Sequence, residues 1–249
     1  MESMKAIKYT FSILIMLAVS ATAFGQKRDP VEIYNSGNDV VKTNRFKDPV
    51  SSDSSMEWRR SDIILKGIDN PDKTATGERE KRWIKDVVVD LIVVYVRPGV
   101  PTSGNAKWDP KNWIVLKSKA ELVAIEKGSN TIVSFFMPPE IRDSYRLEDN
   151  QRLFFIIELS VGGNKVELTQ KNLKKFISSA LAKRIKNMKQ FEKIKSDLAS
   201  ASSANEGWLI SLPQTPFHVQ YSEYFGDNYT KYVKSYNIPT YKKPNSPLK

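Results

Sequence analysis

The sequence contains no cysteine and a single histidine, His218. The missing thiols exclude disulfides, cysteine nucleophiles, thiolate metal sites and a lipid anchor on an N-terminal cysteine. A Ser-His-Asp triad would need His218, but no Gly-x-Ser-x-Gly turn is present to position a serine. Because His218 follows Phe217 in a predicted strand, we interpret it as a surface or packed histidine. We therefore expect no metal and no cofactor.

The N-terminus has the three parts of a secretory signal peptide. Lys5 and Lys8 precede an apolar run over residues 11–19, which small residues follow. The run is shorter than the ~20 residues of a membrane-spanning helix. Cleavage after Ala23 or Gly25 fits the pattern, and we predict a signal peptide over residues 1–25 and a mature chain that begins at Gln26.

The formal net charge is +11. A surface of this sign attracts polyanions such as nucleic acid, acidic glycans, lipopolysaccharide or anionic lipid headgroups in a salt-dependent way. Export argues against nucleic acid as a partner. The alternative is that the charge serves solubility alone.

Period-two hydrophobic patterns predict about seven strands. The strongest, residues 83–96, has apolar residues on both faces over its second half, as expected for a central strand covered on both sides. Glycine-containing turns at 128–130 and 162–164 predict two hairpins. The pattern indicates a mainly β (α+β) domain over residues 57–222, built as an antiparallel sandwich. An extended arm over 26–56 and a Tyr/Lys-rich tail over 223–249 flank it.

One stretch has helical periodicity instead, and it predicts a single long helix over residues 170–198, inserted near the C-terminal end of the domain. Five lysines would lie opposite its apolar stripe. They form either a solvated face or a surface that binds anions or a partner. These candidate binding residues are Lys171, Lys175, Lys186, Lys189 and Lys193.

Carboxylates remain candidates for hydrolytic chemistry, since glycoside hydrolysis needs only two of them. Asp86 and Asp90 share one face of a strand, but four residues at about 3.3 Å each separate them by roughly 13 Å. Their presence on one face is explained more simply if this half of the strand is exposed to solvent. Pairs drawn from different strands cannot be judged from the sequence.

Two strands also carry a resemblance, Trp58-Arg59-Arg60-Ser61-Asp62-Ile63 and Trp83-Ile84-Lys85-Asp86-Val87-Val88-Val89. With the signal peptide before them and the basic helix and tyrosines after them, the chain is similar to exported immunoglobulin-like proteins of type IV pilus-like gene clusters in Akkermansia-type Verrucomicrobia. The resemblance implies an immunoglobulin-like sandwich.

The same resemblance implies a non-enzymatic structural or interaction protein in the periplasm or at the outer membrane or cell surface. Its expected partners are other pilus-like or envelope proteins. The alternative function is a binding module for anionic glycans or envelope polymers, including outer-membrane lipid. A carboxylate hydrolase is a third hypothesis.

Overall fold

The computed structural model describes residues 29–34, 40–47, 57–202, 205–216, 236–237 and 240–241. Its strands form a six-stranded and a five-stranded sheet. The six-stranded sheet contains β1 (Val31–Ile33), β2 (Val41–Lys47), β3 (Glu57–Gly67), β6 (Asn130–Met137), β9 (Ile210–Ser211) and β10 (Tyr236–Asn237). The five-stranded sheet contains β4 (Trp83–Val96), β5 (Trp113–Glu126), β7 (Arg152–Val161), β8 (Asn164–Lys165) and β11 (Thr240–Tyr241).

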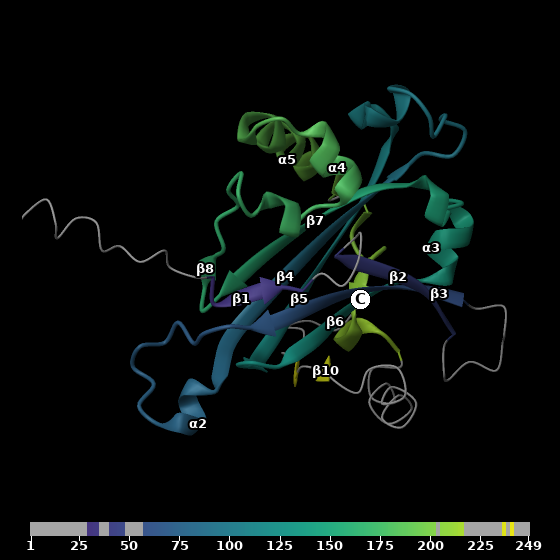
Figure 1. Ribbon diagram of the computed structural model, residues 1–249. Coiled ribbons are helices and arrows are strands. Elements are labelled where there is room, and N and C mark those ends of the chain that lie inside the picture. The colour runs from purple at the N-terminus through teal and green to yellow at the C-terminus, as the bar shows by residue number, and fades with distance from the viewer. Residues whose placement is uncertain are drawn as a thin grey trace, which may run out of the picture.

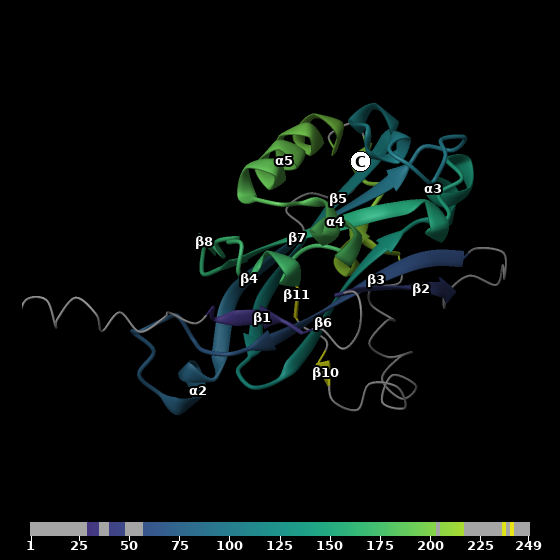
Figure 2. The same cartoon turned by 45° about the horizontal axis from the view of Figure 1, so that its top comes forward.

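The two sheets pack face to face (Figures 1 and 2). Alternate residues of β4, among them Val89, Leu91 and Val93, are buried in one core cluster with Ile63 and Phe135 of the opposite sheet. All named pairings are antiparallel except that of β10 with β6. The predicted immunoglobulin-like antiparallel sandwich is thus confirmed as a mainly β, two-sheet architecture.

The prediction for residues 83–96 is confirmed as well, because β4 pairs with β5 on one side and β7 on the other. Its second half is buried on both faces. Ile92, Val94 and Val96 point away from the sandwich core into a second cluster. The helices that complete this cluster are α4 (Ser179–Arg184) and α5 (Met188–Ser202), which cover the outer face of the five-stranded sheet (Figure 2).

The single helix predicted over 170–198 is wrong. The segment instead forms a short 3-10 turn, η4 (Leu173–Lys175), followed by α4 and α5. Between η4 and α4 the chain is extended and pairs with β7: Ile157 N–H donates to Phe176 O at 2.7 Å, and Ser178 N–H donates to Phe155 O at 3.1 Å. The Ser178 hydroxyl then caps α4.

The second helix break has a similar local signal. Ile185 is extended at the end of α4. The Asn187 side chain then accepts a hydrogen bond from Gln190 N–H at 3.0 Å, as an N-cap does at the start of a helix. No helix within the described ranges is long and apolar enough to cross a membrane.

One of the two predicted hairpins is also wrong. The turn at 162–163 joins the paired strands β7 and β8, as expected. The turn at 127–129 instead carries the chain from one sheet to the other, because β5 pairs with β4 while β6 pairs with β3. Gly67 contacts this crossing, and its carbonyl accepts a hydrogen bond from Gly128 N–H at 2.8 Å.

The segment predicted as an extended arm contributes to the sandwich. β1 pairs with the last residues of β3 and β2 with the preceding ones, so both lie along the same side of that strand. Of the predicted tail, the described residues form β10 and β11, which join different sheets. Tyr241 of β11 also accepts a hydrogen bond from Ser134 N–H of β6 at 3.3 Å. The predicted signal peptide and His218 lie outside the described residues.

Candidate functional site

Arginines gather at the end of the sandwich where β4 and β6 end and β3 and β7 begin. Arg59 lies on β3, Arg142 on α3 (Pro139–Ser144), and Arg152 opens β7. Arg146 lies just past α3, after the C-cap residue Tyr145. The local sequence explains α3, since Pro139 occupies its first position, where a missing N–H has no effect on helix hydrogen bonding.

Carboxylates hold two of these four guanidinium groups, those of Arg59 and Arg142, whereas Arg152 donates to the Thr43 hydroxyl. Glu57 Oε2 lies 3.2 Å from Arg142 Nη1 and 3.5 Å from Arg59 Nη1, and Arg59 Nε lies 3.4 Å from Asp149. Arg142 Nε donates to Asp143 at 2.7 Å, and this hydrogen bond lowers the pKa of Asp143 and raises the pKa of Arg142. Burial beside this network raises the pKa of Tyr95 to about 12.

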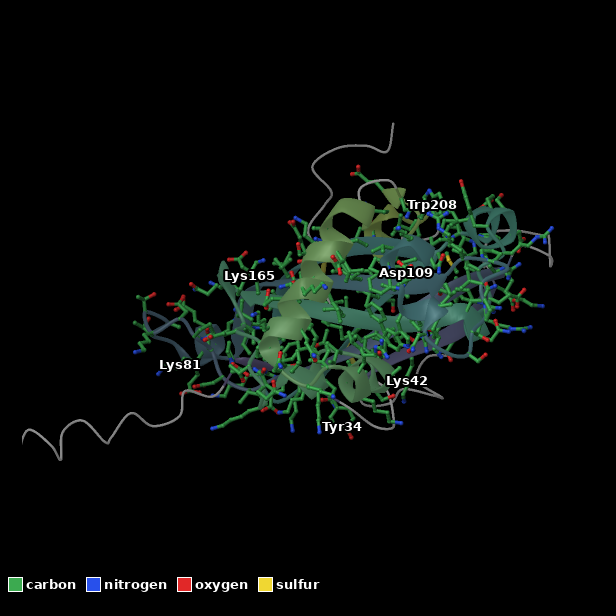
Figure 3. All side chains as sticks on the ribbon, turned by 90° about the horizontal axis from the view of Figure 1, so that it is seen from above. Tyr34, Lys42, Lys81, Asp109, Lys165 and Trp208 are labelled. Atoms are coloured by element: carbon green, nitrogen blue, oxygen red, sulfur yellow. The ribbon has the colours of Figure 1, made fainter. Side chains whose placement is uncertain are left out.

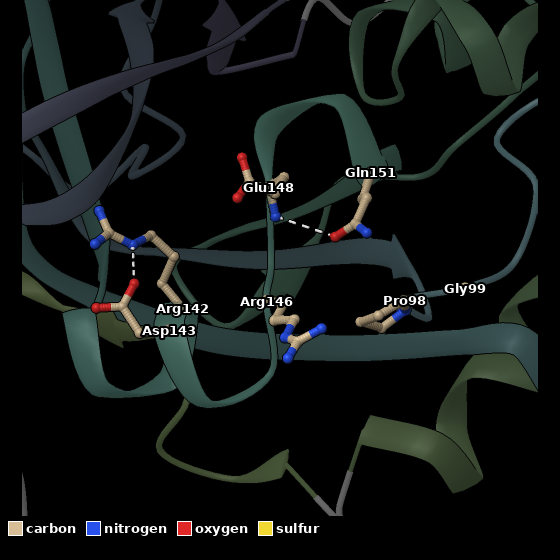
Figure 4. A pocket seen from close by; sticks show the side chains of 7 residues that line it. All are labelled: Pro98, Gly99, Arg142, Asp143, Arg146, Glu148 and Gln151. Atoms are coloured by element: carbon tan, nitrogen blue, oxygen red, sulfur yellow. Dashed lines mark hydrogen bonds and ion pairs between the residues drawn. The ribbon is translucent and has the colours of Figure 1, made fainter.

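An open pocket of about 430 Å³ lies among these groups (Figure 4). Three separate segments line it: the start of the β4–β5 loop, the end of α3, and the 3-10 turn η3 (Asp149–Gln151) with the residue before it. The lining residues are Pro98, Gly99, Arg142, Asp143, Arg146, Glu148 and Gln151.

Arg146 has an unusual backbone, with φ of +50°. Leu147 N–H donates to Arg142 O and Arg146 N–H donates to Asp143 O, which is the Schellman arrangement at a helix C-terminus. The left-handed position in this motif usually holds glycine, and a residue with a Cβ there costs roughly 1–2 kcal/mol. Leu147 is buried in the sandwich core, so the turn is held in place.

Gln151 is oriented by a capping box. Its Oε1 accepts a hydrogen bond from Glu148 N–H at 3.1 Å, and the Glu148 side chain accepts one in return from the backbone of Gln151. The side-chain amide nitrogen of Gln151 is thereby on the side away from Glu148 (Figure 4). This leaves an N–H₂ donor at the pocket.

An aromatic pair lies next to the pocket in sequence. Tyr145, between Asp143 and Arg146, packs against Trp208 with ring centroids 3.9 Å apart and ring planes tilted by 35°. Tyr145 remains 42 % exposed, whereas Trp208 is half-buried against the sandwich core. This exposed aromatic pair is thus adjacent in the chain to Arg146, which lines the pocket.

The predicted lysine face does not exist as one surface of one helix. Lys171 and Lys175 precede α4, Lys186 lies between the two helices, and only Lys189 and Lys193 share α5. All five side chains are exposed, and Lys175 lies 3.8 Å from Glu32 of β1. The breaks in the predicted helix separate these charges.

The strand carboxylates form a pair that the sequence could not reveal. Asp90 is directly opposite Glu158 in the β4–β7 ladder. Burial raises the pKa of Asp90 against the attraction of Lys117. Burial also opposes ionisation of Glu158, but the hydrogen bond from Lys195 of α5 and the neighbouring lysine charges outweigh it and lower the pKa of that carboxyl. We interpret this network as a contact that fixes α5 on the sheet.

Asp86 is not part of this pair. Its φ of +53° shifts the alternation of β4, so that Ile84 and Val87, three residues apart, both enter the sandwich core. In the described part of the chain, no group of three or more His, Cys, Asp or Glu side chains is placed to hold a metal ion.

A second open pocket, of about 400 Å³, lies at the α2 (Glu78–Lys81) end of the sandwich. Trp83 and Val123, which are 40 % and 46 % exposed, give it an apolar lining. It has no cluster of arginines comparable to that of the first pocket, with Arg79 its one lining guanidinium.

The sequence matches no protein-family model and no curated protein. The structure is similar to a crystal structure of a protein from Akkermansia muciniphila, with a TM-score of 0.54 and 13 % sequence identity. The match covers 90 % of this chain and 98 % of that one. At this identity, the likeness establishes a shared fold.

Proposed function

We propose that the protein is a non-enzymatic, exported interaction protein of the cell envelope that docks onto other proteins of a type IV pilus-like machinery. It acts in the periplasm or at the cell surface. The observation that carries this proposal is the exposed Tyr145–Trp208 ring pair together with Arg142 and Arg146 of the pocket, which flank Tyr145 in the chain; we call these residues the docking surface. Tyr, Trp and Arg are the residues on which protein interfaces most often depend.

Two further observations support the proposal. The fold shared with an Akkermansia muciniphila protein agrees with the family resemblance, although a fold alone does not specify a function. The docking surface is also rigid in its parts: Trp208 packs on the core, and the turn after α3 is fixed by Leu147. A preformed surface loses less conformational entropy on binding.

The test is a pull-down from detergent-solubilised cell envelope, with the chain from Gln26 to Lys249 as bait at low and high salt. We expect pilus-like proteins to be recovered and to remain bound at high salt, because a packed interface is less screened than exposed charge. Recovery of glycan or lipopolysaccharide alone, lost as salt rises, would contradict the proposal and favour the binding-module alternative.

A matched pair of baits locates the interface. Tyr145→Ala removes the exposed ring beside the arginines and is expected to reduce partner recovery. Tyr34→Ala removes a ring of similar exposure, 41 % against 42 %, and is expected to leave recovery unchanged. Figure 3 shows Tyr34 and Trp208 at opposite margins of the molecule. Equal losses with both baits would place the interface elsewhere.

A further inference from the structure

Arg146 combines a strained backbone with a side chain that is not used within the fold. Its φ is +50°, in a turn position where glycine would fit without strain. The guanidinium is exposed and lines the pocket, and it has no hydrogen bond or ion pair with another described residue. The turn itself has a structural role, but an arginine in place of glycine adds strain there without a structural benefit, which is a reason to look for a functional one.

The neighbouring carboxylates do not neutralise this charge. Asp143 is turned toward Arg142 Nε at 2.7 Å, and the Glu148 side chain accepts a hydrogen bond from the backbone of Gln151. Figure 4 shows both carboxylates directed away from the Arg146 guanidinium. Arg146 therefore presents an uncompensated positive charge, with the donor amide of Gln151 lining the same pocket.

We infer that this pocket binds one carboxylate, an aspartate or glutamate side chain of a partner protein, through the Arg146 guanidinium and the Gln151 side-chain amide. The inference rests on the proposed function, because it names the chemical group that the docking surface recognises. A guanidinium matches the two oxygens of a carboxylate with parallel hydrogen bonds.

The charge around the pocket favours a single carboxylate over a polyanion. Asp143 and Glu148 line it and the exposed Asp149 follows Glu148 in the chain, and these carboxylates repel additional negative charge. A sulfated glycan would bring several negative charges close to these carboxylates. One carboxylate replaces the solvation of one guanidinium and leaves the other ion pairs intact.

The test is a titration of the ¹⁵N-labelled chain from Gln26 to Lys249, followed by NMR at the Arg146 Nε–H and the Gln151 side-chain amide. The probe is N-acetylglutamate amide, and its matched control is N-acetylglutamine amide, which has the same shape without the charge. We expect a saturable shift with the first and none with the second. No saturable shift, or equal shifts with both, would overturn the inference.

Three variants separate binding from folding. Arg146→Gly removes the guanidinium and relaxes the left-handed turn, so it is expected to abolish the shift at Gln151 with an unchanged or higher denaturation midpoint. Gln151→Glu retains an acceptor for the capping box but replaces the donor amide with a charged oxygen, and is also expected to abolish binding. Arg79→Gln removes one exposed charge at the α2 end and is expected to bind as the native chain does. Binding that survives Arg146→Gly would overturn the inference.

A heparin disaccharide serves as the competing probe. Stronger binding of this probe than of N-acetylglutamate amide at Arg146 would overturn the inference and indicate that the pocket binds an anionic glycan instead of a protein carboxylate. Because the titration needs no envelope partner, its failure is distinguishable from the failure of the pull-down. If the titration is negative but the pull-down recovers partners, the carboxylate inference is refuted and the proposed docking function is not.

Discussion

Gly67 lies where the chain crosses between the sheets, and its replacement by alanine tests whether this crossing depends on close backbone contact. A Cβ atom at residue 67 would lie 2.5 Å from the carbonyl oxygen of Glu126 and 3.1 Å from its carbonyl carbon. Both are backbone atoms, which cannot rotate away as the end of a side chain can. We expect Gly67→Ala to lower the free energy of unfolding by about 1–3 kcal/mol, as overpacking in a well-packed interior does.

The sign of the effect is informative. In an open site with a compatible backbone, glycine to alanine raises stability by about 0.4–1 kcal/mol, because it restricts the unfolded chain. Gly77 is the matched control, since a Cβ there meets no atom within 4 Å. Gly77 is also the N-cap of α2, where alanine is a weaker residue than glycine, so the two effects offset each other in Gly77→Ala.

The assay is urea denaturation, with the midpoint and slope measured for each variant. The side chain of Ile84 offers a further check, because its Cδ1 would lie 3.1 Å from the new methyl group. If the backbone contact dominates, adding Ile84→Val does not restore stability. A midpoint for Gly67→Ala at or above that of the native chain would refute the reasoning, and so would full rescue by Ile84→Val.

Further predictions concern the helical layer and the sheets. Phe191→Ala, at a fully buried position of α5, is expected to lower the free energy of unfolding by about 3–5 kcal/mol in the same denaturation assay. Asp90→Asn is expected to raise stability at pH 7 and to have no effect at pH 3, because the raised pKa of Asp90 makes its ionised form unfavourable in the folded state. Glu158→Gln is expected to lower stability at pH 7, since the pKa of Glu158 is lowered in the folded state. A stability change of the same sign in both variants would contradict these opposite pKa shifts. Tyr241→Phe removes the acceptor of Ser134 N–H, and we expect faster hydrogen exchange of that amide and a loss of about 1 kcal/mol.

Patterns confined to one strand were predictable from the sequence, and pairings between distant segments were not. The apolar residues on both faces of β4 correctly indicated a covered central strand, because each buried position requires an apolar residue at that point of the sequence. The turn at 127–129 resembled that of a hairpin, but its path depends on Gly67, which lies far away in the sequence. The single long helix was wrongly predicted for the same reason, because the chain is interrupted where Phe176 and Ser178 pair with the distant strand β7.

Local capping signals would have corrected part of the helix prediction. Ser178 and Asn187 are typical N-cap residues, and each begins a helix in the structure. The pocket offered a weaker signal. Glu148 and Gln151 have the spacing of a capping box, but nothing in the sequence brings them to Arg146 or to the loop at Pro98. Lysine spacing alone predicted one face of one helix, whereas the structure divides these lysines among separate segments.

The strands β10 and β11 are short, yet they occupy positions that would otherwise be open to another chain. Along β6, β10 pairs with Asn130 and Thr131, the Tyr241 hydroxyl accepts from Ser134 N–H, and β9 pairs with Phe135 and Phe136. β11 covers β5 at Leu122 and Ala124. Removal of residues 236–241 would expose unpaired backbone at the edges of both sheets at once. Such edges are templates for strand addition and aggregation. We therefore expect these few residues to oppose self-association by strand addition.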